Sequence, residues 1–219
     1  MMTNKNNKTG IRLVFYFLGF LIMTLGVAVS IKSGLGVSPN SSVPYTLTVV
    51  FGIELGLATT IVSIVAALLQ IPMLRKDFKI THLLQIPVSV VFGFFMTSCV
   101  KFVNFIPNPS SFVIKLVLML ISTVIVAIGV FMYLSAGYIP LPTEGLVLAI
   151  AQVTKVKFGT MKVIGDVTMV LISLVMCLVK IHSFGSIGLG TIVSALLVGT
   201  EVKFITGKVG NKVKELLGK

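Results

Sequence analysis

Six apolar segments dominate the chain, and each has about the 20 residues that a helix needs to cross a lipid bilayer. They cover residues 12–31, 56–74, 82–101, 115–135, 159–180 and 185–202. Hydrophobic residues make up 56% of the 219 residues and charged residues only 11%, whereas a soluble domain carries roughly 25% charged residues. Too few polar side chains remain to cover a water-facing surface. The sequence therefore predicts an all-α polytopic membrane protein with six transmembrane helices.

Two further apolar runs, 41–52 and 143–154, are shorter than the others. A helix of this length extends about 18 Å, whereas the hydrocarbon core of a bilayer is about 30 Å thick. Each run follows a Gly- and Pro-rich stretch, at 33–39 and at 136–142. A broken loop before a half-helix is typical of a re-entrant segment or a discontinuous helix. We therefore expect two short re-entrant or half-helices, and full crossing by both is the alternative.

The two halves of the chain resemble each other. When residues 12–71 are shifted by 103 positions onto 115–174, several backbone-shaping residues coincide: Gly26 with Gly129, Gly34 with Gly137, Pro39 with Pro142, and Gly56 with Gly159. Because Gly and Pro set the path of the backbone, we expect the halves to share a fold. Each half has three spans, an odd number, so the two repeats would be inverted. Inverted repeats place substrate near the bilayer midplane.

The basic residues predict the orientation in the membrane. With three spans per half and a cytoplasmic N-terminus, 14 of the 18 Lys and Arg residues lie inside, and only Lys32, Lys101, Lys115 and Lys180 lie outside. With four spans per half, 13 basic residues would lie inside and 5 outside. The three-span arrangement is preferred because the basic loop 75–79 then stays inside. The net charge of +12 is interpreted as a topology signal, so we expect no nucleic-acid partner.

This topology divides one membrane domain into five parts. They are a cytoplasmic segment 1–11, membrane repeat 12–102, an external linker 103–114, membrane repeat 115–204 and a basic cytoplasmic tail 205–219. No cleavable signal peptide is evident before the first span. We therefore expect a multi-pass protein of the cell membrane with both termini in the cytoplasm. The tail either lies on the anionic inner leaflet or extends into water.

The starts of the two short helices are the clearest candidates for a binding site. They read Pro39-Asn40-Ser41-Ser42 and Pro142-Thr143-Glu144. Ser, Thr and Asn favour a helix N-cap, and Pro favours the first turn. A helix that starts inside the membrane directs unpaired N–H groups and its positive dipole end into the protein, where an anion or a polar solute can bind. The alternative is that these residues only cap buried helices.

Acidic residues inside the membrane are a second kind of candidate. Asp166 lies within the span 159–180, and its counterpart in the first repeat is Ser63. An ionisable group at this depth is costly and should face the protein interior. Lys162 lies one helical turn earlier, so Asp166 either forms a structural ion pair with it or contacts a solute or proton. Glu144 likewise either caps its helix or carries a proton.

Motifs for catalysis or cofactor binding do not occur in the sequence. We find no phosphate-binding P-loop, no Gly-x-Ser-x-Gly elbow and no His-Glu-x-x-His motif. The two Cys and two His residues do not have the spacing of metal ligands. We therefore expect no enzyme activity, no cofactor and no metal.

Three stretches of Gly and small residues resemble a known family. Residues 32–39 (KSGLGVSP), 158–160 (FGT) and 188–199 (GLGTIVSALLVG) are similar to motifs of the YczE/YyaS/YitT group of bacterial integral membrane proteins. The likeness covers most of residues 12–204. Family members often have Trp after the first of these motifs, where this chain has Asn40. The resemblance implies a multi-span bacterial membrane protein and supplies no agreed substrate.

Two functions of different classes agree with these observations. The preferred hypothesis is a permease or channel for a small polar or anionic solute, because both halves carry a half-helix start. The alternative is a membrane anchor or regulatory partner that transports nothing, or the substrate-capture subunit of a multi-component transporter. Besides the bilayer and the solute, a second copy of the chain or another protein stays open as a partner.

Overall fold

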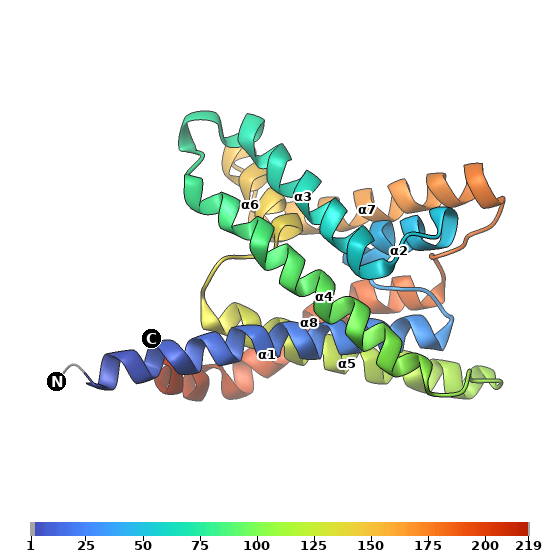
Figure 1. Cartoon of the computed structure of the whole chain (residues 1–219), viewed down its shortest axis with the longest axis horizontal. Coiled ribbons are helices and arrows are strands. Elements are labelled where there is room, and N and C mark those ends of the chain that lie inside the picture. The colour runs from blue at the N-terminus through green and yellow to red at the C-terminus, as the bar shows by residue number, and fades with distance from the viewer. Residues whose placement is uncertain (1–2, 219) are drawn as a thin grey trace.

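The computed structural model describes residues 3–218, and the side chains from residue 9 onward. Helices joined by turns and short loops make up these residues, and Figure 1 shows how the helices are arranged. The eight α-helices are α1 (Thr3–Ser33), α2 (Pro39–Phe51), α3 (Leu55–Leu74), α4 (Gln85–Asn104), α5 (Phe112–Ala136), α6 (Pro142–Thr154), α7 (Phe158–Ile181) and α8 (Leu189–Leu217). Two 3-10 turns, Arg75–Asp77 and Ile80–Leu84, connect α3 to α4.

All helices except α2 and α6 are long and apolar enough to cross a membrane, which gives six candidate spans. The helices α2 and α6 have 13 residues each, or about 20 Å of helix. The predicted plan of six long and two short helices is therefore confirmed, and the chain is a multi-pass membrane protein. Two boundaries differ: α1 begins at Thr3 and α8 continues to Leu217. Helix thus extends into the segments 1–11 and 205–219, because no proline stops it there.

The pair α1 and α5 makes the most extensive contact between helices in the molecule, and the two helices run side by side along its length (Figure 1). Glycines allow this close approach. A Cβ atom on Gly19 would lie 2.6 Å from the backbone nitrogen of Tyr133, and one on Gly129 would collide with the backbone of Met23. Small residues have this role in membrane proteins because lipid provides no hydrophobic force between helices. Beside these glycines, Tyr16, Phe20 and Tyr133 form a buried aromatic cluster.

The other helices pack in a regular order, and two of them contact this pair. α4 packs on α1, and α8 packs on α5. α6 packs on α3, and α2 packs on α7. α3 also packs tightly on α4, where Gly56 and Gly93 face each other with no room for a Cβ atom. The helix α7 lies on α2 and α6, and its only buried residues are Met161, Ser173 and Cys177.

The start of α1 and the end of α8 lie at the same end of the long axis, and the turn between α3 and α4 lies there too (Figure 1). We call this the termini end of the molecule. An even number of crossings returns the chain to the side on which it began, so six spans agree with this arrangement. The turn carries Arg75, Lys76 and Lys79, the basic loop that was predicted to share a side with both termini.

Candidate functional site

The loops that precede α2 and α6 bring both short helices to a start inside the molecule. The preceding long helices end in left-handed glycines, since Gly34 and Gly137 both have φ of +66°. Glycine adopts this conformation without steric cost. A few residues later each short helix begins with a proline, Pro39 or Pro142, in its first turn. Proline fits there because the first N–H groups of a helix have no partner within the helix.

Contacts from distant segments fix both loops. Arg12 of α1 donates from Nε and Nη2 to the carbonyl oxygen of Ala136, at 3.1 and 3.0 Å. The hydroxyl of Tyr16 donates to the carbonyl oxygen of Ile139 at 2.6 Å. The other loop is held from α8, where the N–H of Gly190 donates to the carbonyl oxygen of Leu35 at 2.7 Å. The first half of the chain thus positions the start of α6, and the second half positions the start of α2.

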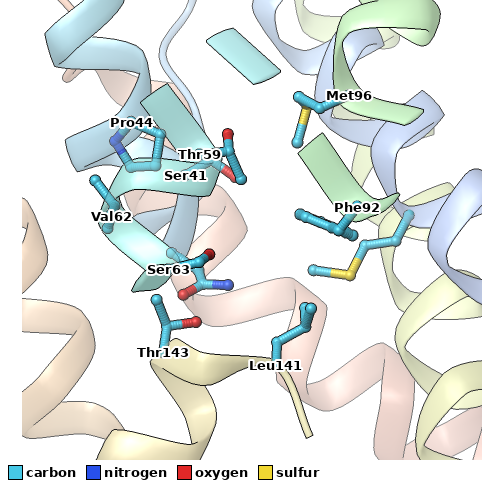
Figure 2. A pocket seen from close by; sticks show the side chains of 11 residues that line it. Ser41, Pro44, Thr59, Val62, Ser63, Phe92, Met96, Leu141 and Thr143 are labelled. Carbon is cyan, nitrogen blue, oxygen red and sulfur yellow. The ribbon is translucent and has the colours of Figure 1, made fainter. Parts of the chain in front are cut away.

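The two short helices begin at one small central cavity, shown in Figure 2. Its wall also includes parts of α1, α3 and α4. The lining residues are Met23, Asn40, Ser41, Pro44, Thr59, Val62, Ser63, Phe92, Met96, Leu141 and Thr143. The cavity volume of about 20 Å³ is enough for about one water molecule. Residues from the first turns of both short helices therefore line the same small hollow.

Three polar side chains of this wall have no hydrogen-bond partner among the described residues. They are Asn40 on α2, Ser63 on α3 and Thr143 on α6. Ser63 is only 5% exposed and Thr143 only 9% exposed. Buried polar groups are nearly always hydrogen-bonded, so hydroxyls that face a cavity without a protein partner need a water or a solute there. By contrast, Thr59 of the same wall donates to the carbonyl oxygen of Leu55 at 2.7 Å.

The remaining predicted residues at the helix starts lie in this wall or behind it. Ser41 lines the cavity and forms a hydrogen bond of 3.3 Å with Ser38. Ser42 is fully buried and donates to the carbonyl oxygen of Pro39 at 2.7 Å, so its hydroxyl stabilises the first turn of α2. The carbonyl oxygen of Pro142 accepts from Nε2 of Gln70 at 3.2 Å.

Comparison with known proteins places the chain in a family. The model of a family of unknown function, DUF6198, matches residues 10–207. The chain belongs to the DUF6198 family. Two relatives come from Bacillus subtilis (strain 168). The uncharacterized membrane protein YczE is 29% identical over 196 residues, which cover 89% of this chain and 85% of YczE. The uncharacterized protein YyaS is 25% identical over 188 residues, which cover 85% of this chain and 88% of YyaS.

The resemblance predicted from the Gly-rich motifs is thereby confirmed. Both relatives lack an assigned activity, so membership in DUF6198 assigns the chain to a class of membrane proteins but gives no substrate. No solved structure matches this chain.

The predicted acidic residues of the DUF6198 chain are not part of the cavity wall. Nζ of Lys162 lies 2.7 Å from Oδ1 of Asp166, and both side chains are 29% exposed. This is the ion pair that sequence spacing suggested as the structural alternative. Glu144 is half-buried and lies close enough for the charges of Lys162 and Asp166 to act on it. The three side chains lie on α6 and α7, and none of them lines the cavity.

Sequence reasoning missed two residues in this DUF6198 protein. Gln70 and Gln85 are each only 1% exposed, and Nε2 of Gln70 donates to Oε1 of Gln85 at 2.7 Å. A glutamine within an apolar span was the signal that could have identified them, because buried amides must find partners. Among the described residues, no group of three or more His, Cys, Asp or Glu side chains could hold a metal ion.

Proposed function

We propose that this protein is a permease for a small polar or anionic solute, which binds at the central cavity between two inverted three-span halves. The observation that supports this best is the meeting of both half-helix starts at one hollow, where Asn40, Ser63 and Thr143 have no protein partner. Unpaired N–H groups at a helix start attract anions and polar groups. Hydroxyl and amide side chains beside them add further donors and acceptors.

The order of helix packing supports the inverted halves. Under the repeat offset, α1 to α4 correspond to α5 to α8. The contact of α1 with α4 then corresponds to that of α5 with α8, and the contact of α3 with α6 corresponds to that of α7 with α2. One contact breaks the pattern. α3 packs tightly on α4 at Gly56, whereas its counterpart Gly159 has nothing within 4 Å of an added Cβ atom. A carrier in one of its two orientations is expected to be asymmetric in this way.

The cavity volume favours a carrier over an open channel. About 20 Å³ holds one water and excludes a larger solute. A solute therefore requires movement of the surrounding helices to enter or leave. The helix α7 is the least buried of the helices around the short segments, so its movement would disrupt the fewest contacts.

Reconstitution tests this function directly. Purified protein in liposomes should carry at least one solute from a panel of small polar and anionic metabolites, and the same solute should raise the unfolding temperature in detergent. Empty liposomes and liposomes with heat-inactivated protein are the controls. A panel that gives neither flux nor stabilisation would count against the permease.

The alternative is a membrane partner that transports nothing, such as a regulatory or substrate-capture subunit. The ion pair of Lys162 and Asp166, which is 29% exposed within a span, favours it, since charges at this depth are normally covered by protein or water. Crosslinking from α7 followed by purification from native membranes separates the two functions. A stoichiometric second protein together with no solute flux would support the subunit.

A further inference from the structure

A second hollow lies on the termini end of the central cavity. We call it the vestibule, a cleft of about 280 Å³ whose walls include Gln70, Gln85, Gly145, Thr81, His82 and Gln152. Thr81 and Gln152 are exposed, while Gln70, Gln85 and Gly145 are buried. The cleft therefore leads from the molecular surface into the protein. All three glutamines of the chain lie on its walls.

The outer part of the vestibule adjoins a polar groove beside the turn between α3 and α4. This groove, of about 450 Å³, contains Lys76, Asp77 and Lys79 and shares Thr81, His82 and Gln152 with the vestibule. Its two lysines would raise the local concentration of anions. A polar route therefore extends from the basic turn inward to the buried pair Gln70 and Gln85.

This glutamine pair separates the vestibule from the central cavity. Nε2 of Gln70 donates to Oε1 of Gln85 at 2.7 Å and to the carbonyl oxygen of Pro142 at 3.2 Å. The next residue, Thr143, lines the central cavity, and so does Leu141 on the other side. The first turn of α6 is therefore the partition, and Gln70 holds it closed from the vestibule side.

Packing at Gly145 strengthens the closed arrangement. A Cβ atom on Gly145 would lie 2.7 Å from Nε2 and 2.9 Å from Oε1 of Gln85, so α6 rests directly on the glutamine pair. At the same time, Oε1 of Gln70 is buried and has no hydrogen-bond partner among the described residues. An unsatisfied amide oxygen destabilises the arrangement that buries it. The contact between α6 and the glutamine pair is thus closely packed, but it leaves one amide oxygen without a hydrogen bond.

We propose that Gln70 and Gln85 control entry of solute from the termini end into the central cavity. In the described structure they hold the start of α6 over the passage. When Gln70 releases the carbonyl oxygen of Pro142, the first turn of α6 can move away and join the vestibule to the cavity. This inference extends the proposed permease by naming the residues at its entrance. The amide groups of this pair line the opened passage, so the entrance suits a polar solute.

The rate at which a buried cysteine reacts with a thiol reagent tests the entrance without any solute. The background carries Cys99→Ala and Cys177→Ala, and Thr143→Cys is the reporter, with Ser63→Cys as a second reporter in case the first does not fold. A membrane-impermeant methanethiosulfonate is added to either side of sealed vesicles. Because the cavity has no room for the reagent, modification measures opening of the partition.

The variants Gln70→Met and Gln85→Met keep the side-chain length and remove the hydrogen bonds. Each should speed modification from the termini side about five- to tenfold, the factor expected from the loss of one hydrogen bond. Gln152→Met on the outer wall is the matched control and should leave the rate unchanged.

Equal rates in all variants, or equal acceleration by Gln152→Met, would overturn the proposed role of Gln70 and Gln85. If modification accelerates as expected but liposomes carry no solute, the result supports the role of the two glutamines and rejects the permease. If liposomes carry solute but the modification rates do not change, only the proposed role of Gln70 and Gln85 is rejected.

Discussion

The hydroxyl of Thr123 in α5 donates a hydrogen bond to Oε1 of Glu201 in α8 over 3.0 Å. The second carboxyl oxygen of Glu201, Oε2, is buried and has no hydrogen-bond partner in the described part of the chain. The two residues lie near the middle of their helices, where α8 packs on α5. A carboxylate placed there without a cation is costly.

Glu201→Gln should leave the protein as stable or more stable by about 1 kcal/mol, because the amide keeps an acceptor for Thr123 and removes the charge. Glu201→Lys should destabilise strongly. Thermal unfolding in detergent measures both, and Glu215→Gln, at an exposed position on the same helix, serves as the control. A large loss of stability in Glu201→Gln would indicate that the charge itself is required.

Gly129→Ala should separate α1 from α5, since the added methyl group collides with the backbone of Met23. Overpacking of this kind costs about 1–3 kcal/mol, measured as a lower unfolding temperature and an aggregated fraction in gel filtration. Gly199→Ala is the matched control in α8, because nothing lies within 4 Å of its added Cβ atom. It should keep or slightly raise stability, since Ala favours helix more than Gly does. Equal effects of the two substitutions would contradict the close α1–α5 contact.

Ser63→Ala and Thr143→Val should abolish stabilisation by any transported solute while changing the stability of the solute-free protein little, because neither hydroxyl has a protein partner. Thermal shift with the solute found in the liposome panel is the measurement. Ser98→Ala and Thr168→Val remove hydroxyls of the same types from exposed positions outside the cavity. If these controls weaken the solute effect as much as the cavity variants do, the binding site lies elsewhere.

The ion pair Lys162–Asp166 should behave as a buried pair in a double-mutant cycle. Lys162→Met alone leaves an uncompensated carboxylate, so it should destabilise more than the combined Lys162→Met and Asp166→Asn. The pair Lys101–Glu54, whose side chains are 72% and 54% exposed, gives the comparison, because exposed pairs contribute about 0–1 kcal/mol. Unfolding temperatures of both cycles decide the question. Additive effects at Lys162 and Asp166 would mean that the pair faces water.

Side-specific labelling should place the basic turn and the C-terminal helix on the same face of the membrane. In the cysteine-free background, Lys76→Cys and Lys208→Cys should react with an impermeant thiol reagent from the cytoplasmic side, and Lys101→Cys from the outer side. Intact cells and inverted vesicles provide the two orientations. Reaction of Lys76→Cys and Lys208→Cys from opposite sides would require a different number of spans and would remove the inverted repeat.

Local sequence signals predicted most of the helices. They could not predict which residues far apart in the sequence come into contact. Pro39 and Pro142 mark the starts of α2 and α6 because proline acts on its own backbone. Asn40 and Thr143 stand out in the sequence as residues of the helix starts, but Met23 and Phe92, which line the same cavity, look like ordinary span residues. Gln70 and Gln85 are 15 positions apart, and only the fold brings them to Pro142. The length of α8 was underestimated, because its basic stretch 203–217 continues the helix without a break.

The contact of Arg12 and Tyr16 with the loop before α6 has a consequence for biosynthesis. The first helix leaves the ribosome long before α5 and this loop exist, and translation of the intervening residues takes roughly 5 to 20 seconds. During that interval α1 lacks its main partner, and its glycine face at Gly19 and Gly26 is open to lipid or to other nascent helices. An N-terminal fragment that ends before α5 should therefore be a substrate for membrane quality control, and co-expression of the missing half should rescue it.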